Sequence, residues 1–112
     1  MDVKKNRCDI ADRYLRDAVR QENSVHSQAA AAFEAGYFYL LVATDAPVGG
    51  PEGTHPSVEL LLQAAVQFGL ERSVMKPALG FIELQYSPEG VAHLLDELLP
   101  WARKMQALAA SA

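Results

Sequence analysis

Cysteine is nearly absent from this sequence, because Cys8 is the only one among 112 residues. An intramolecular disulfide is therefore impossible, and no secretory signal sequence is visible. These features predict a protein of the reducing cytoplasm. A membrane span is not expected, because the longest low-charge stretch, residues 27–45, ends at Asp45 and carries tyrosines that suit a packed core.

Signatures of familiar enzyme classes are also missing. Gly49 and Gly50 lack the spacing and the lysine of a phosphate-binding loop, and no serine lies in a G-x-S-x-G motif. Glu89 and His93 are four residues apart, whereas the di-iron motif of helical bundles has a three-residue spacing. The formal net charge of -4 disfavours broad electrostatic binding to nucleic acid. We expect neither a metal nor another cofactor.

The composition is that of one folded domain. Half of the residues are hydrophobic and 21% are charged, which excludes an intrinsically disordered chain. We expect a single helical-bundle domain over residues 1–112, with frayed ends at 1–8 and 109–112. Prolines and glycines alternate after residue 46, so an exposed loop is predicted at 46–55.

The stretch from Ser27 to Asp45 organises the chain. It is rich in alanine and too long for an ordinary strand, so it predicts a helix. Small residues form one of its faces (Ala29, Ala32, Gly36, Ala43), and bulkier ones form another (Ala30, Phe33, Tyr37, Phe38, Leu41). A helix that is apolar on most sides is usually buried, and Gly36 favours a close crossing by a neighbouring helix.

Four further segments have helical patterns and make an all-α, antiparallel up-and-down bundle of four to five helices. Their expected ranges are from Asp9, as the N-cap, to about Gln21, from Pro56 to Gly69, from Pro77 to Leu84, and from Pro88 to about Leu108. The third helix of the chain should bury Val58, Leu61, Leu62, Ala65 and Val66. An extended conformation at 77–84 is the alternative, but no second strand exists to pair with it. Pro100 should kink or divide the last helix, and Trp101 should lie at a packing seam.

Two sets of residues are candidates for chemistry. Arg20 and His26 have the R-x5-H spacing of some metal-independent ribonucleases, in which Arg20 would steady a phosphate and His26 would transfer protons. They converge only if the helix breaks near Asn23, and otherwise they are polar residues beside a helix junction. Tyr37, Tyr39 and His55 are candidates for lining a small-ligand pocket, although aromatic residues at helical spacing are more often core.

Several motifs follow one another in the order found in a known family. They are ADRYLRDAV at 11–19, AAAAFEAGYFYLLVA at 29–43, GTHPSVELL at 53–61 and LGFIELQYSPEGVAHLL at 79–95. This order resembles the HEPN domains (higher eukaryotes and prokaryotes nucleotide-binding). The resemblance implies a bundle of four to five helices that is commonly dimeric. It also implies ribonuclease activity in members with an R-x(4-6)-H motif near the start of the last helix.

The chain departs from that motif, because Gln85 stands where the arginine is expected and His93 lies eight residues beyond it. Glutamine supplies no cation to a phosphate. We therefore expect a non-enzymatic, HEPN-like binding or assembly module that forms a homodimer and binds a protein partner, with nucleotide or RNA as weaker candidates. The alternatives are the Arg20 and His26 ribonuclease and a small-ligand-binding bundle. The expected interface residues, chosen from the apolar face of the last helix, are Leu98, Trp101 and Met105.

Overall fold

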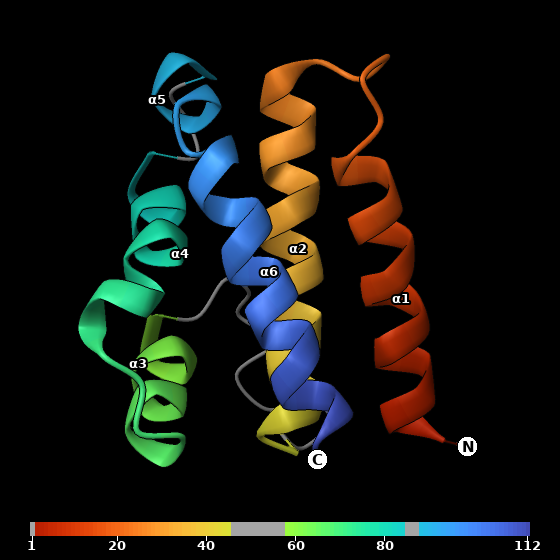
Figure 1. Ribbon diagram of the computed structural model, residues 1–112, viewed down its shortest axis with the longest axis vertical. Coiled ribbons are helices and arrows are strands. Elements are labelled where there is room, and N and C mark those ends of the chain that lie inside the picture. Colours follow the sequence, from red (N-terminus) through yellow and green to blue (C-terminus); the bar gives the residue numbers. More distant parts are fainter. Residues whose placement is uncertain (1, 46–57, 85–87) are drawn as a thin grey trace.

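The computed structural model describes residues 2–45, 58–84 and 88–112, and these residues form six helices and no strand (Figure 1). The helices are α1 (Val3–Ala18), α2 (Val25–Ala43), α3 (Val58–Gln67), α4 (Arg72–Leu84), α5 (Pro88–Ala92) and α6 (Leu95–Ala110). The all-α bundle predicted from the sequence is confirmed. The helix count exceeds the prediction because the last predicted helix is divided at His93 and Leu94, not at Pro100, which lies inside α6. The predicted loop at 46–55 lies outside the described residues.

Helix α2 is the centre of the bundle, as the sequence predicted. Helices α1 and α6 both pack along it, and α4 and α5 complete the enclosure from the side of α6 (Figure 1). Helix α1 runs antiparallel to α2, whereas α6 runs in the same direction as α2, so the two chain ends lie at the same end of the bundle. Helix α3 packs chiefly against α4 and is therefore the most peripheral of the longer helices.

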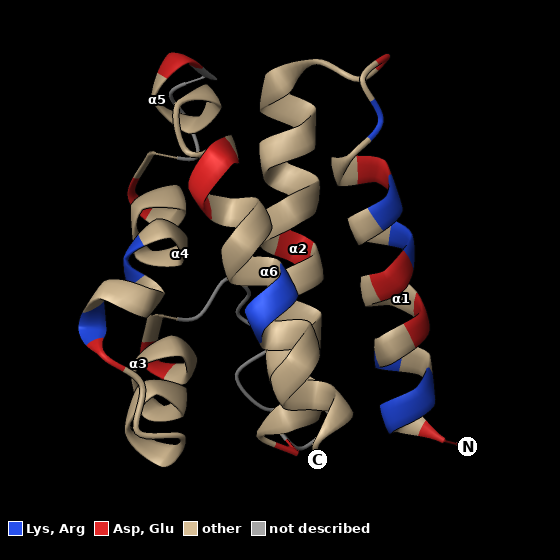
Figure 2. Ribbon diagram, in the orientation of Figure 1, with Lys and Arg blue, Asp and Glu red and all other residues tan. Residues whose placement is uncertain are grey.

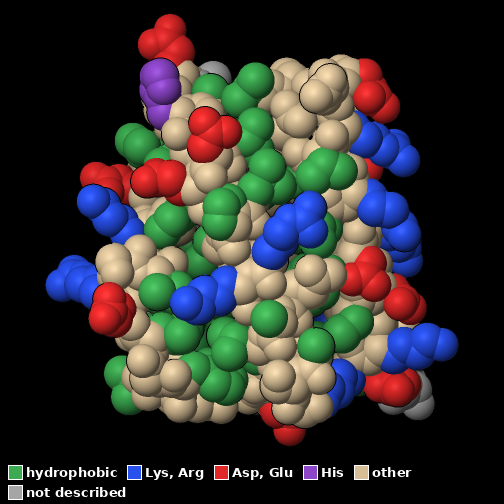
Figure 3. Space-filling model, viewed as in Figure 1, with side chains coloured by type: hydrophobic (Ala, Val, Ile, Leu, Met, Phe, Trp, Pro, Cys, Tyr) green, Lys and Arg blue, Asp and Glu red, His purple; other side chains and the backbone are tan. Residues whose placement is uncertain are grey.

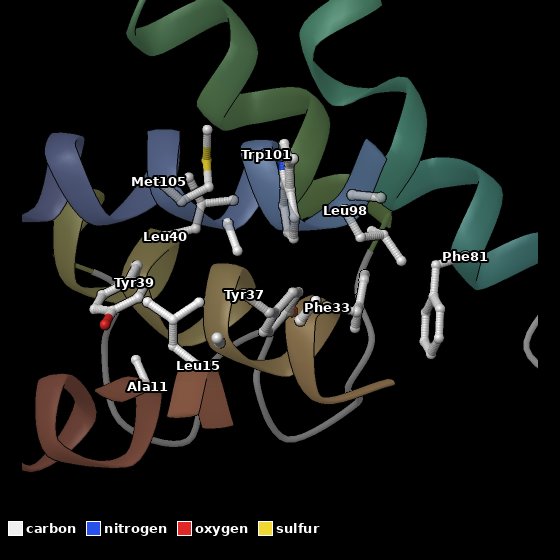
Figure 4. Close-up of a cluster of buried hydrophobic side chains, with 14 of the residues drawn as sticks. Ala11, Leu15, Phe33, Tyr37, Tyr39, Leu40, Phe81, Leu98, Trp101 and Met105 are labelled. Atoms are coloured by element: carbon white, nitrogen blue, oxygen red, sulfur yellow. The ribbon is translucent and has the colours of Figure 1, made fainter. Parts of the chain in front are cut away.

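Aromatic rings fill the centre of the core (Figure 4). The Phe33 ring stacks on the Phe81 ring with centroids 4.4 Å apart, and Trp101 lies on another side at 5.9 Å. Tyr37 adds a further stacked ring at 5.8 Å from Phe33. These contacts join α2, α4 and α6, which places Trp101 at the packing seam that the sequence predicted.

The two terminal helices extend closer to the chain ends than predicted. Helix α1 begins at Val3 because Asp2, not Asp9, is the N-cap, and its carboxylate accepts a hydrogen bond from the Lys5 backbone N–H at 3.0 Å. Residues 3–8 therefore belong to α1, which corrects the predicted start of this helix at Asp9. At the other end α6 continues to Ala110, and Ala109 is buried. Ser24 caps α2, because its side-chain oxygen accepts a hydrogen bond from the Ser27 N–H at 3.1 Å.

Helix α4 also departs from the prediction, because it begins at Arg72 and passes through Pro77. The stretch 77–84 is helical, which confirms the preferred interpretation over an extended one. Gly69 ends α3 as predicted, in a left-handed conformation with φ +62°. The Leu70 N–H then donates to the Ala65 carbonyl at 2.8 Å, which satisfies a carbonyl group at the helix end.

The buried face of α3 differs from the predicted one. Leu60, Leu61 and Ala64 are buried, whereas Val58, Leu62 and Val66 are exposed by 41%, 47% and 84%. Three consecutive leucines at 60–62 give α3 two overlapping apolar faces, and the sequence pattern cannot choose between them. The packing of α3 against α4 selects the face that contains Leu60 and Ala64.

Candidate functional site

The predicted catalytic pair is not assembled in the structure. The chain does leave the helical conformation between Ala18 and Val25, as convergence of Arg20 and His26 required. However, Arg20 is exposed and pairs with Asp17 at 3.6 Å, and His26 lies half-buried in the first turn of α2. No hydrogen bond or ion pair joins the two side chains in the part of the chain that the structure describes.

The three predicted ligand-lining residues have different positions. Tyr37 is 1% exposed, and its ring stacks on Phe33 in the core. Tyr39 is also buried, but its hydroxyl group reaches a surface cleft between α1 and α6. His55 lies outside the described residues. Of the two that the structure describes, Tyr39 is the one that lines a cleft.

The three predicted interface residues of the last helix are all internal. Leu98, Trp101 and Met105 are at most 3% exposed, and the Trp101 ring lies against Gly36 of α2 (Figure 4). Their apolar surface is used within one chain, so none of them is available to a second copy in this conformation. An interface between copies would need another apolar surface.

Helix α3 provides such a surface. Val58, Leu62 and Val66 follow one another at four-residue intervals and form a line that we call the α3 stripe. Hydrophobic side chains are visible at the surface over α3 in Figure 3. An apolar cleft of about 640 Å³ lies beside the stripe, between α3 and α4, and its lining includes Leu62, Ala65, Val66, Leu70, Met75 and Leu79.

A second cleft, of about 350 Å³, is polar. It lies between α1 and α6, and the Tyr39 hydroxyl of α2 forms its floor. This hydroxyl donates a hydrogen bond to Asp12 Oδ1 of α1 and accepts one from Gln106 Nε2 of α6 at 3.2 Å. Burial, reinforced by the hydrogen bond to Asp12, raises the pKa of Tyr39 above its ordinary value, so the phenol remains a proton donor to Asp12 at neutral pH.

Arg16 and Arg103 line the same cleft from opposite helices, and both are exposed. The sequence analysis assigned no role to Asp12, Arg16, Arg103 or Gln106. The spacing of Asp12 and Arg16 by four residues signals that they share one face of α1. Nothing in the sequence shows that α6 delivers Arg103 and Gln106 to that face.

Two further properties concern metals and membranes. Among residues 2–45, 58–84 and 88–112, no group of three or more His, Cys, Asp or Glu side chains is arranged to hold a metal ion. Over the same residues, no helix has both the length and the apolar character needed to cross a bilayer. The Cys8 thiol is half-buried, and burial, together with the nearby Asp12 carboxylate, raises its pKa, which disfavours the nucleophilic thiolate.

Comparison with known proteins assigns neither a family nor a fold relative to this chain. No protein-family model, curated protein or solved structure matches the chain.

Proposed function

We propose that this chain is a non-enzymatic assembly module in which two copies pair through the α3 stripe. The observation that carries the proposal is the exposure of Leu62 and Val66, at 47% and 84%, beside an apolar cleft. Large apolar side chains that stand together at a surface mark interaction sites more often than single exposed ones do. Val58 extends the same line by one further turn, so the stripe runs the length of α3.

The spacing of the stripe suits a second copy of the same chain. Valine, leucine and valine stand at 58, 62 and 66, so the stripe has the same order of residue types from either end. A two-fold axis beside Leu62 brings the two copies of that leucine together. It also places Val58 of each copy against the partner's Val66. Such a self-complementary arrangement is what a symmetric dimer requires.

Charge at the ends of α3 is compatible with this antiparallel pairing. Glu59 lies in the first turn of α3, and Arg72 begins α4 just beyond the other end of α3, where it lines the apolar cleft. In the antiparallel pair, Glu59 of each copy therefore lies near Arg72 of the other copy. Opposite charges at the rim help to fix register and orientation more than they add affinity.

The area available sets the expected strength of the dimer. Helix α3 has ten residues and is therefore about 15 Å long. Stable complexes bury about 800 Å² on each partner, more than one such helix offers. We therefore expect a dimer that dissociates on dilution, with the cleft residues of α4 enlarging the contact.

Sedimentation velocity over a range of concentrations tests this proposal. The wild type should show a sedimentation coefficient that rises with concentration, and Leu62→Glu should remain a monomer. Val25→Glu is the matched control, because Val25 is also 47% exposed but lies at the start of α2. A monomeric wild type, or equal behaviour of the two variants, would contradict pairing through α3. A larger complex formed only with another protein would show instead that the occupant of the stripe is a different chain.

The HEPN-like assignment, the absence of catalysis and the cytoplasmic location remain predictions from the sequence. The ribonuclease alternative requires Arg20 and His26 to act together, and the ion pair of Arg20 with Asp17 gives that alternative no support. A protein partner on the remaining surface is compatible with the assembly module, because the stripe occupies α3 alone.

A further inference from the structure

The polar cleft between α1 and α6 has an ordered floor. Asp12, the Tyr39 hydroxyl and Gln106 form a hydrogen-bonded bridge from α1 over α2 to α6. Tyr39 is only 2% exposed, so its ring is held by the core and its hydroxyl position is fixed. The bridge therefore holds α1 and α6 in a fixed relation to each other at this level of the bundle.

The directions of the helices bring two arginines to the same level. Helices α1 and α6 run antiparallel in Figure 1, and both chain ends lie at one end of the bundle. Arg16 is four residues after Asp12, and Arg103 is three residues before Gln106, so they lie about 6 Å and about 4.5 Å from the bridge along their helix axes. Because the helices are antiparallel, these two displacements have the same direction. The two guanidinium groups therefore flank one part of the cleft, which both residues line.

Among the described residues that line this cleft, positive charges outnumber negative ones. In the described part of the structure neither Arg16 nor Arg103 has an ion-pair partner, although the chain as a whole carries a net charge of -4. The single acid that lines the cleft is Asp12, so two positive charges face one negative charge. Charged residues are spread along α1 and nearly absent from α2 (Figure 2). The contribution of α2 to the polar lining of the cleft is therefore the uncharged Tyr39 hydroxyl group.

We propose that this cleft binds a phosphomonoester of a small polyol, with the phosphate held between Arg16 and Arg103. Two guanidinium groups match the charge of a phosphate dianion and can each donate two parallel hydrogen bonds to it. The polyol hydroxyl groups then lie over the bridge, where the second carboxylate oxygen of Asp12 and the amide oxygen of Gln106 accept no hydrogen bond from the described residues. Hydroxyl groups next to Asp12 also keep the phosphate away from that carboxylate.

The probe for this site is glycerol 1-phosphate, titrated into isotopically labelled protein while the backbone amide NMR spectrum is recorded. We expect saturable shifts concentrated around Asp12, Arg16, Tyr39 and Arg103. Glycerol alone should not bind, and inorganic phosphate should bind more weakly. Binding should weaken below about pH 6, where the phosphate loses its second charge.

Arginine variants test the assignment, and because both side chains are exposed, the variants should fold. Arg16→Gln and Arg103→Gln should each weaken binding by about tenfold or more, as loss of a charge-assisted hydrogen bond predicts. Arg13→Gln is the matched control on α1, because Arg13 is exposed and lines a different cleft. It should leave the affinity unchanged.

Three results would overturn the proposal: no saturable shifts at millimolar probe, an unchanged affinity in Arg103→Gln, or an equal loss in Arg13→Gln. Equal binding of inorganic phosphate would overturn the polyol part. The cleft involves α1, α2 and α6 and does not include α3. Leu62→Glu should therefore bind the probe like the wild type, so the ligand and assembly proposals can fail separately.

Discussion

The indole ring of Trp101 occupies the space where any residue larger than glycine at position 36 would place its Cβ. A Cβ built on Gly36 would lie 2.2 Å from Cζ3 of Trp101, well inside van der Waals contact. The Trp101 Nε1 atom is buried without a hydrogen-bond partner in the described part of the chain. Packing therefore holds the ring against α2, and Gly36 is what allows α6 to approach so closely.

The first prediction concerns this crossing. Gly36→Ala should destabilise the protein by up to about 2 kcal/mol, because overpacking typically costs about 1–3 kcal/mol and the higher helix propensity of alanine offsets about 1 kcal/mol of that. Chemical denaturation measures the free energy of unfolding. Trp101→Leu in the same chain removes the overlapping ring, so the cost of Gly36→Ala should be smaller in that background.

Gly80→Ala is the matched control for this substitution. Gly80 lies inside α4, and a Cβ there would lie 3.6 Å from the nearest Leu94 carbon, which is an ordinary contact. This variant should be neutral or more stable, because alanine has the higher helix propensity. A Gly36→Ala protein as stable as Gly80→Ala would show that α2 and α6 are not held at this distance in solution.

The central position of α2 could be predicted because its residues are apolar on most sides of the helix. The small stripe with Gly36 indicated a close crossing, and the position of Trp101 after Pro100 indicated a seam. The close crossing and the seam were both confirmed. Each prediction needed only the sizes of the side chains in one short segment. The face of α3 could not be predicted, since the run Leu60, Leu61 and Leu62 supports two faces and only the neighbour α4 decides between them.

The second prediction concerns Tyr39 and pH. The raised pKa means that the folded state favours the protonated phenol, so this stabilisation is complete below the ordinary tyrosine pKa of about 10 and is lost as the pH rises above it. Tyr39→Phe should lose about 1 kcal/mol at neutral pH with the hydrogen-bonded hydroxyl. The difference between wild type and variant in unfolding free energy should then stay constant up to about pH 9 and shrink as the pH rises through about 10 and above. A difference that stays constant would mean that the phenol ionises as readily in the folded as in the unfolded chain.

The third prediction concerns Pro100, which is exposed and lies inside α6. A proline there has no N–H to donate within the helix and costs about 3 kcal/mol relative to alanine, partly offset by about 1 kcal/mol from a stiffer unfolded chain. Pro100→Ala should therefore raise the free energy of unfolding by about 2 kcal/mol. Pro100→Gly should gain less, because glycine is a poorer helix former. A loss of stability in Pro100→Ala would show that a proline kink is needed to seat Trp101.

The polar cleft shows where sequence reasoning ends. Tyr39 was a candidate because it is an aromatic residue with a polar group, and Asp12 and Arg16 share a face of α1 by their spacing. Arg103 and Gln106 come from a segment more than sixty residues away from Tyr39, and only the packing of α6 on α2 brings them there. The burial of Leu98, Trp101 and Met105 within one chain could not be predicted either, because an apolar helix face looks the same in sequence whether it packs within a chain or between chains.

Disulfide trapping tests the central proposal, the pairing of two copies through α3, most directly. In a Cys8→Ser background, Leu62→Cys should form a covalent dimer under mild oxidation, because a disulfide requires Cβ atoms about 3.5–4.5 Å apart. A mixture of Val58→Cys and Val66→Cys chains should prefer the mixed dimer over either like pair. The control Val25→Cys should remain monomeric at the same concentration. If Leu62→Cys forms no more dimer than Val25→Cys does, the two copies do not meet along α3 and the assembly proposal is wrong.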